Sequence, residues 1–168
     1  MPRVYLVADH QLTVEGRVRA GYLWAGPDAT LCGIAAAWWH GIWSEQPGLV
    51  DITVPRRRRL PAQPGIRACR RDLNSEDRVN LNGLWVTAVP LTVLEASVEA
   101  GSCLLDRALQ RRVTLAELRA AHDRNRGRRG SGDATKLLRA AEDQAASEAE
   151  RVLVGLLRSA GMSGWRCG

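Results

Sequence analysis

Several residue types are scarce in this 168-residue sequence. It contains no phenylalanine and a single lysine, Lys136, so arginine supplies all but one of its 24 basic residues. A genome rich in G and C gives the same bias, so the choice of arginine does not by itself indicate phosphate binding. The formal charge is +6, and 45% of the residues are hydrophobic while 25% are charged. These proportions exclude an intrinsically disordered chain and are typical of a folded globular protein.

Long hydrophobic runs are also absent. The longest, residues 31–39, contains Gly33 and is far shorter than the roughly 20 residues of a membrane-spanning helix. The N-terminal segment reaches Asp9 and His10 before the apolar core of a signal peptide could form. We therefore expect a cytoplasmic protein that neither spans a membrane nor is secreted.

Paired cysteines of the metal-binding type are missing as well. The four cysteines are spread along the chain without a Cys-x-x-Cys pair, which predicts free thiols in a cytosolic protein. The spacing of Cys32 and His40 matches no standard metal site. We expect no metal and no other cofactor.

Recognisable catalytic patterns are lacking too. A phosphate-binding loop needs glycine before its lysine and Ser or Thr after it, whereas Thr135 and Leu137 flank Lys136. The chain has no Gly-x-Ser-x-Gly motif. Glu150 is a weak candidate for a catalytic acid beside the apolar face of the last predicted helix, although Ser147 and Glu150 also match a helix-capping box. We predict a protein that is not an enzyme.

The hydrophobic periodicity predicts an α+β fold, in which several helices pack on a small sheet and a helical extension follows at the C-terminus. Asn82-Gly83 is typical of a tight hairpin turn, and Thr114 with Glu117 matches a capping box. Asp28 or Thr30 is the expected cap of the helix before His40. Strands are predicted at 3–7, 49–54, 66–69 and 79–86, and helices near 14, 30, 90, 103 and 115, with two more after residue 133.

The sequence Trp38-Trp39-His40 allows two interpretations. The tryptophans could form a stacking platform for nucleic-acid bases. The interpretation that we favour places them in the core, with His40 in the last turn of a helix, where the helix dipole favours a cation.

The positive charge is concentrated in two segments. Eight cations and four anions give residues 51–78 a net charge of +4, and seven cations and two anions give residues 119–141 a net charge of +5. Arginines on loops can neutralise phosphates without reading bases, so we predict sequence-nonspecific contact with DNA; a solvated loop is the alternative. The candidate nucleic-acid-binding residues are Arg56, Arg57, Arg58, Arg59, Arg126, Arg128 and Arg129.

The amino-acid sequence of several segments resembles that of a known family. The segments at 29–41, 50–58, 83–95 and 104–109 resemble, in this order, the C-terminal domain of actinobacterial AbiEi-type antitoxins, which belong to type IV toxin-antitoxin systems. The resemblance implies an antitoxin-like domain at residues 1–121, a Gly/Arg linker at 122–133 and, at 134–168, the start of a Vsr-like endonuclease-fold domain. It also implies a toxin protein as partner.

The sequence departs from these families in three places. Antitoxins of this type usually begin with a winged helix-turn-helix, whereas this chain starts at what resembles the last wing strand. Glu150 matches an acid in the first helix of the nuclease family, but the strands that carry its other metal ligands would follow Gly168, so we expect no nuclease activity. Leu91 stands where the antitoxins commonly have arginine, and Glu95 where they commonly have aspartate.

Three hypotheses for function follow from these observations. The first is a non-enzymatic, antitoxin-like regulator that binds a toxin or, through its arginine loops, DNA. The second is a truncated component of a Vsr-like endonuclease that is inactive alone. The third is a degenerate open reading frame without retained activity.

Overall fold

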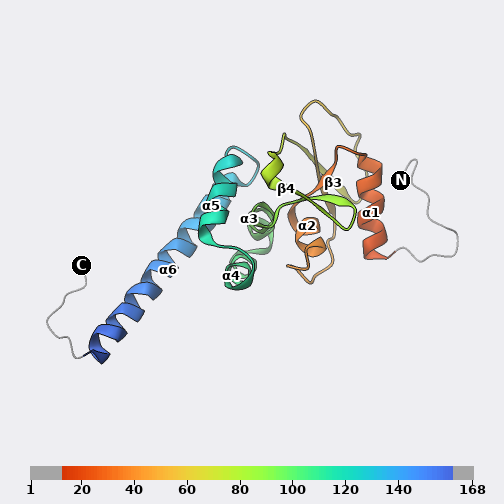
Figure 1. The fold of residues 1–168 in the computed structure, drawn as a ribbon. Coiled ribbons are helices and arrows are strands. Elements are labelled where there is room, and N and C mark those ends of the chain that lie inside the picture. Colours follow the sequence, from red (N-terminus) through yellow and green to blue (C-terminus); the bar gives the residue numbers. More distant parts are fainter. Residues whose placement is uncertain (1–12, 161–168) are drawn as a thin grey trace.

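A computed structural model describes residues 13–160 and confirms the α+β fold. A mixed sheet has the strand order β3-β2-β1-β5-β4, and helices lie on both of its faces (Figure 1). The predicted strand at 3–7 lies outside the described residues. The strands are β1 (Thr30–Leu31), β2 (Val50–Val54), β3 (Ile66–Arg70), β4 (Arg78–Leu81) and β5 (Leu84–Thr87). The helices are α1 (Val14–Ala25), α2 (Gly33–Trp39), α3 (Val89–Ala100), α4 (Ser102–Arg111), α5 (Leu115–Arg124) and α6 (Ser131–Ser159), with a short 3-10 helix, η1 (Ser75–Asp77).

One face of the sheet is apolar and is covered by α1. Alternate residues of β2, Ile52 and Val54, share a core with Val18 and Tyr22 of α1. Gly21 allows the close approach, because a Cβ atom at this position would lie 3.1 Å from Cγ1 of Val50. Alternation along β2 therefore sends its other side chains, Asp51 and Thr53 among them, to the opposite face.

The start of α2 differs from the prediction. Neither Asp28 nor Thr30 caps this helix, which begins at Gly33 after Cys32. Thr30 instead belongs to β1, where it pairs with Thr53. Placing this short strand between β2 and β5 satisfies backbone groups that would otherwise be buried without hydrogen bonds, and this gain outweighs the local preference of Thr30 for a cap.

The two strongest local signals are confirmed. Asn82 and Gly83, with φ of 52° and 82°, form the turn between the antiparallel strands β4 and β5. Thr114 and Glu117 form both hydrogen bonds of a capping box at the start of α5.

Helices α3, α4 and α5 and the first half of α6 form a second core beside the sheet. Leu91, at the position where the resembling family commonly has arginine, is fully buried in it together with Leu94. An apolar side chain is therefore what this core requires at position 91. Helix α3 lies between the sheet and the other three helices, α4, α5 and α6, as Figure 1 shows.

The C-terminal extension is one continuous helix, α6, where the sequence predicted two. Residues 142–150 contain neither glycine nor proline, so nothing interrupts helical hydrogen bonding between the two predicted segments. The first half of α6 packs into the helical core, whereas Val152, Leu153 and Leu156 in the second half are 57%, 56% and 62% exposed.

A buried carboxylate joins the sheet to the helical core. Asp77, only 1% exposed, accepts hydrogen bonds from Nη2 of Arg124 at 2.7 Å and from Nδ2 of Asn125 at 2.7 Å. Arg124 and Asn125 lie at the end of α5, whereas Asp77 ends η1 and directly precedes β4. This contact fixes the end of α5 beside the start of the hairpin.

Candidate nucleic-acid interface

The first arginine segment, Arg56–Arg59, forms a turn directly after β2. Arg57 pairs with Asp28 at 3.3 Å. Arg58 lies against Gly26, where a Cβ atom would meet its Nη2 at 2.6 Å, so its guanidinium rests on the end of α1. The two exposed side chains of the segment without an ion pair among the described residues are those of Arg56 and Arg59.

The second arginine segment lies in the tight turn between α5 and α6. Arg126 pairs with Asp123 at 2.7 Å, whereas Arg129 is exposed and has no ion pair in the described part of the chain. Arg128 turns inward, and its Nε and Nη2 atoms are buried without a hydrogen-bond partner among residues 13–160. The turn lies against α3, because a Cβ atom on Gly130 would be 3.2 Å from Cγ1 of Val98.

The two arginine segments meet at the residues that follow β3. The backbone N–H of Arg56 donates to Asp72 at 3.2 Å, which holds the first segment beside this stretch. Arg128 lies close enough to Arg71 for its guanidinium pKa to be lowered, first by burial and further by the charge of Arg71. Both connections lie toward the top of Figure 1, above α4. We call the surface formed by residues 56–59, 70–72 and 126–129 the basic edge.

A layer of polar side chains lies between the sheet and α3, next to the basic edge. Arg67 of β3 bonds both Asp51 of β2 and Glu99 of α3. Burial raises the pKa of the Asp51 carboxyl, and its bond with Arg67 acts in the opposite direction. These contacts connect the edge strand β3 to β2 and to α3.

A second ion pair of this layer is more deeply buried. Arg71 and Glu95 pair with side chains that are only 14% and 11% exposed. Glu95 also accepts a hydrogen bond at 3.2 Å from the backbone N–H of Gly33, at the start of α2. Nη2 of Arg71 is buried and has no partner among the described residues. One carboxylate thus lies opposite two inward-facing guanidinium groups, those of Arg71 and Arg128.

Two thiols meet in the same layer. The Cys32 thiol hydrogen-bonds to Cys69, and this bond, with further contributions from the Thr53 hydroxyl and the charge of Arg71, lowers the pKa of Cys69 to about 6. The same bond, followed by burial, raises the pKa of Cys32. Cys69 is therefore the more acidic thiol of the pair.

We expect Cys69 to react with iodoacetamide mainly as a thiolate above about pH 6. An ordinary thiol, with a pKa near 8.5, is about 1% ionised at pH 6.5, and the lower nucleophilicity of an acidic thiolate offsets part of this difference. Cys69 should thus be alkylated roughly fivefold faster than the exposed Cys103 at pH 6.5. Mass spectrometry of the two peptides over a pH series measures both rates.

Two variants test the cause of this reactivity. Cys32→Ala removes the hydrogen-bond donor and should move the midpoint of Cys69 alkylation to higher pH, whereas Cys32→Ser keeps a donor and should leave it close to that of the parent protein. A Cys69 rate that follows the Cys103 rate at every pH contradicts the thiolate.

The remaining candidate residues lie away from this layer. Trp38 and Trp39 are partly buried against the apolar core of the sheet, which agrees with the core interpretation. Nε2 of His40 lies 2.9 Å from the carbonyl oxygen of Thr87, and burial lowers the pKa of this histidine. Glu150 is exposed on α6.

The sequence did not reveal Arg71, Glu95 or the thiol pair as parts of one site. The sequence of β3 and the residue after it could have indicated this site. Period-two alternation puts Arg67, Cys69 and Arg71 on one face. The matching spacing of Glu95 and Glu99, one helical turn apart, could have indicated the helix that covers them.

Comparison of the chain with protein-family models, with curated proteins and with solved structures finds no match. Within residues 13–160, no group of three or more His, Cys, Asp or Glu side chains is placed to hold a metal ion. No helix in the same range is long and apolar enough to cross a membrane.

Proposed function

We propose that the chain is a non-enzymatic, antitoxin-like regulatory protein of the cytoplasm that contacts nucleic acid through the basic edge. The observation that carries the nucleic-acid part is the position of two distant arginine segments at the same end of the molecule, next to the residues that follow β3 (Figure 1). Exposed arginines without ion pairs in the described part of the chain are available to neutralise phosphates and release counterions. The edge offers four of them: Arg56, Arg59, Arg70 and Arg129.

The contact we propose is with phosphates and not with base edges. The basic edge consists of turns and the end of the edge strand β3, whereas base readout in the major groove requires an inserted helix or β-ribbon. Arg57 and Arg126 already have carboxylate partners, and Arg128 faces inward, so these three contribute less than the sequence suggested.

The antitoxin part of the proposal, with a toxin protein as partner, rests on the sequence resemblance. Two positions that differ from the residues usual in the family are compatible with the antitoxin proposal. Leu91 is accommodated in the core, and Glu95 keeps the negative charge of the usual aspartate. The alternative of an inactive Vsr-like nuclease component has weaker support, because Glu150 lies exposed on α6.

Replacing Arg56, Arg59 and Arg129 together by alanine should weaken the binding of a DNA duplex and flatten its dependence on salt. Each phosphate contact contributes about 0.9 to the slope of log K against log salt concentration, so the loss of three contacts should reduce the slope by roughly 2.7. Fluorescence anisotropy of a labelled duplex over a salt series measures this slope.

The matched control is a triple alanine variant on α4 and α6, outside the basic edge. Arg107, Arg111 and Arg139 are exposed and have no ion pairs among the described residues, so this variant removes the same charge away from the basic edge. Equal losses in both variants would show that net charge alone governs binding. The nucleic-acid proposal fails if the parent protein shows no salt-sensitive binding at low ionic strength.

A further inference from the structure

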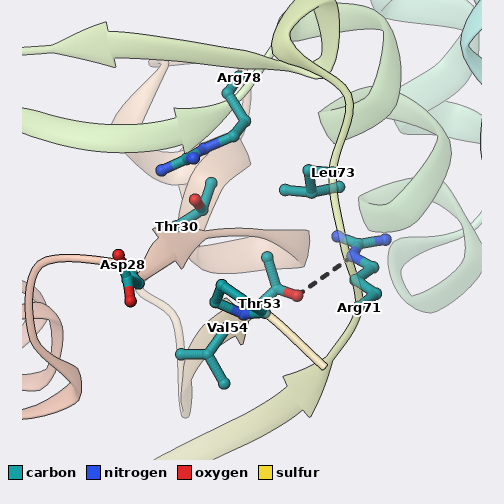
Figure 2. Close-up of a pocket in the computed structure, with 8 residues that line it drawn as sticks. Asp28, Thr30, Thr53, Val54, Arg71, Leu73 and Arg78 are labelled. Atoms are coloured by element: carbon teal, nitrogen blue, oxygen red, sulfur yellow. Dashed lines mark hydrogen bonds between the residues drawn. The ribbon is translucent and has the colours of Figure 1, made fainter. Parts of the chain in front are cut away.

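A small pocket beside the basic edge contains arginine nitrogens without acceptors. It opens partly to solvent, has a volume of about 20 Å³, and is lined by Thr30, Thr53, Arg71 and Arg78 together with Asp28, Val54, Pro55 and Leu73. Arg71 and Arg78 lie on different sides of Thr30 and Thr53, as Figure 2 shows. The pocket therefore combines guanidinium and hydroxyl groups in one place.

The guanidinium groups at this pocket are incompletely paired. Nη2 of Arg71 and Nε of Arg78 are buried without a hydrogen-bond partner in the described part of the chain. Leaving a buried donor unsatisfied is costly, and more so when the donor is charged. The Nε atom of Arg71 uses the Thr53 hydroxyl as acceptor at 3.3 Å, but a hydroxyl does not neutralise the charge.

Charge around the pocket remains positive after the ion pairs are counted. Glu95 balances Arg71, and Arg57 balances Asp28, the carboxylate in the pocket lining. Arg78 has no ion pair among the described residues and stacks on Trp85, with its Cζ 4.8 Å from the ring centroid. Arg128 adds further positive potential behind Arg71. Arg78 is thus the cation of the pocket lining that has no ion pair among the described residues.

We propose that this pocket binds a phosphate group, one oxygen of which enters the space lined by Arg71, Arg78 and the two threonines. A volume near 20 Å³ holds one water-sized atom, which matches a single phosphate oxygen while the rest of the group stays at the mouth. Phosphate is preferred over a carboxylate because the oxygen that enters can accept from the Thr30 hydroxyl while its remaining oxygens stay at the mouth. The inference rests on the proposed function in one respect: it takes the phosphate to be part of a nucleic-acid backbone.

The test uses the full chain and inorganic phosphate, at an ionic strength held constant with sodium chloride. Phosphate should raise the melting temperature of the parent protein and change the emission of Trp85, because Arg78 stacks on this ring. A Trp85→Phe variant identifies the contribution of this tryptophan. Arg78→Gln should weaken phosphate binding at least about tenfold, the loss expected when a charge-assisted hydrogen bond is removed.

Two further variants make the test specific. Thr30→Val keeps the shape of a fully buried side chain but removes its hydroxyl, and should weaken phosphate binding severalfold. Arg139→Gln removes an exposed arginine of α6 and should bind phosphate as the parent does. The inference is wrong if phosphate has no effect beyond that of chloride, or if Arg78→Gln and Thr30→Val both bind it normally.

The outcome separates this inference from the proposed function. Phosphate binding that depends on Arg78, in a protein that does not bind DNA, would support a pocket for free phosphate and reject the nucleic-acid proposal. If the protein shows salt-sensitive DNA binding but its pocket does not bind inorganic phosphate, the nucleic-acid proposal for the basic edge is supported and the phosphate site is rejected. If both hold, Arg78→Gln should also weaken the binding of DNA.

Discussion

Asp77→Ala is expected to lower the free energy of unfolding by about 3 kcal/mol, because the buried Nδ2 of Asn125 loses its carboxylate acceptor and Arg124 keeps only its pair with the exposed Glu76. The loss should be large since Asp77 is only 1% exposed and connects η1 and β4 to the end of α5. Urea denaturation followed by circular dichroism measures the change.

Two substitutions serve as controls for this prediction. Asp123→Ala also removes a carboxylate from an arginine pair near the end of α5, but Asp123 is 48% exposed, so little change in stability is expected. Asp77→Asn keeps an oxygen acceptor without the charge and should fall between Asp77→Ala and the parent protein. An Asp77→Ala variant as stable as Asp123→Ala would contradict the role given to the buried contact.

Features that depend on neighbouring residues were predictable from the sequence. The Asn82-Gly83 turn and the capping box at Thr114 are local, because each is decided by the backbone preferences and side-chain reach of four successive residues. The position of Thr30 in a strand, where the sequence suggested a helix cap, was not predictable in the same way. Its place in β1 is decided by β2 and β5, which are distant in the sequence.

The candidate site depends on such distant contacts. Arg71 and Glu95 are separated by 24 positions, and the two arginine segments by about 70, so composition and spacing could locate the charges but not bring them together. The sequence also treated Arg56–Arg59 as equivalent, whereas the fold pairs Arg57, rests Arg58 on α1 and leaves the other two exposed. Which arginines are available is a property of the tertiary structure.

Glu95→Gln is expected to be as destabilising as the loss of Asp77, at about 3 kcal/mol or more, although it barely changes the shape of the side chain. It removes the carboxylate that pairs with Arg71 and whose charge also acts on Arg128, so two inward-facing cations lose this opposing charge. The acceptor of the hydrogen bond from the Gly33 N–H would then be a neutral amide oxygen in place of a carboxylate. Thermal and urea unfolding measure the loss.

Glu99→Gln, one helical turn further along α3, is the matched control. Glu99 is 52% exposed and bonds Arg67, which keeps Asp51 as a second partner, so this variant should lose little stability. Equal losses in the two variants would contradict the importance of the buried position.

Phosphate should also restore part of the stability that Glu95→Gln loses. An oxyanion held by Arg71 supplies the counter-charge that the substitution removes, so the rise in melting temperature with inorganic phosphate should be larger in Glu95→Gln than in the parent or in Glu99→Gln. If phosphate instead stabilises all three proteins equally, its effect does not act through Arg71. The size of this difference therefore reports directly on whether the polar layer under α3 and the phosphate pocket share one guanidinium group.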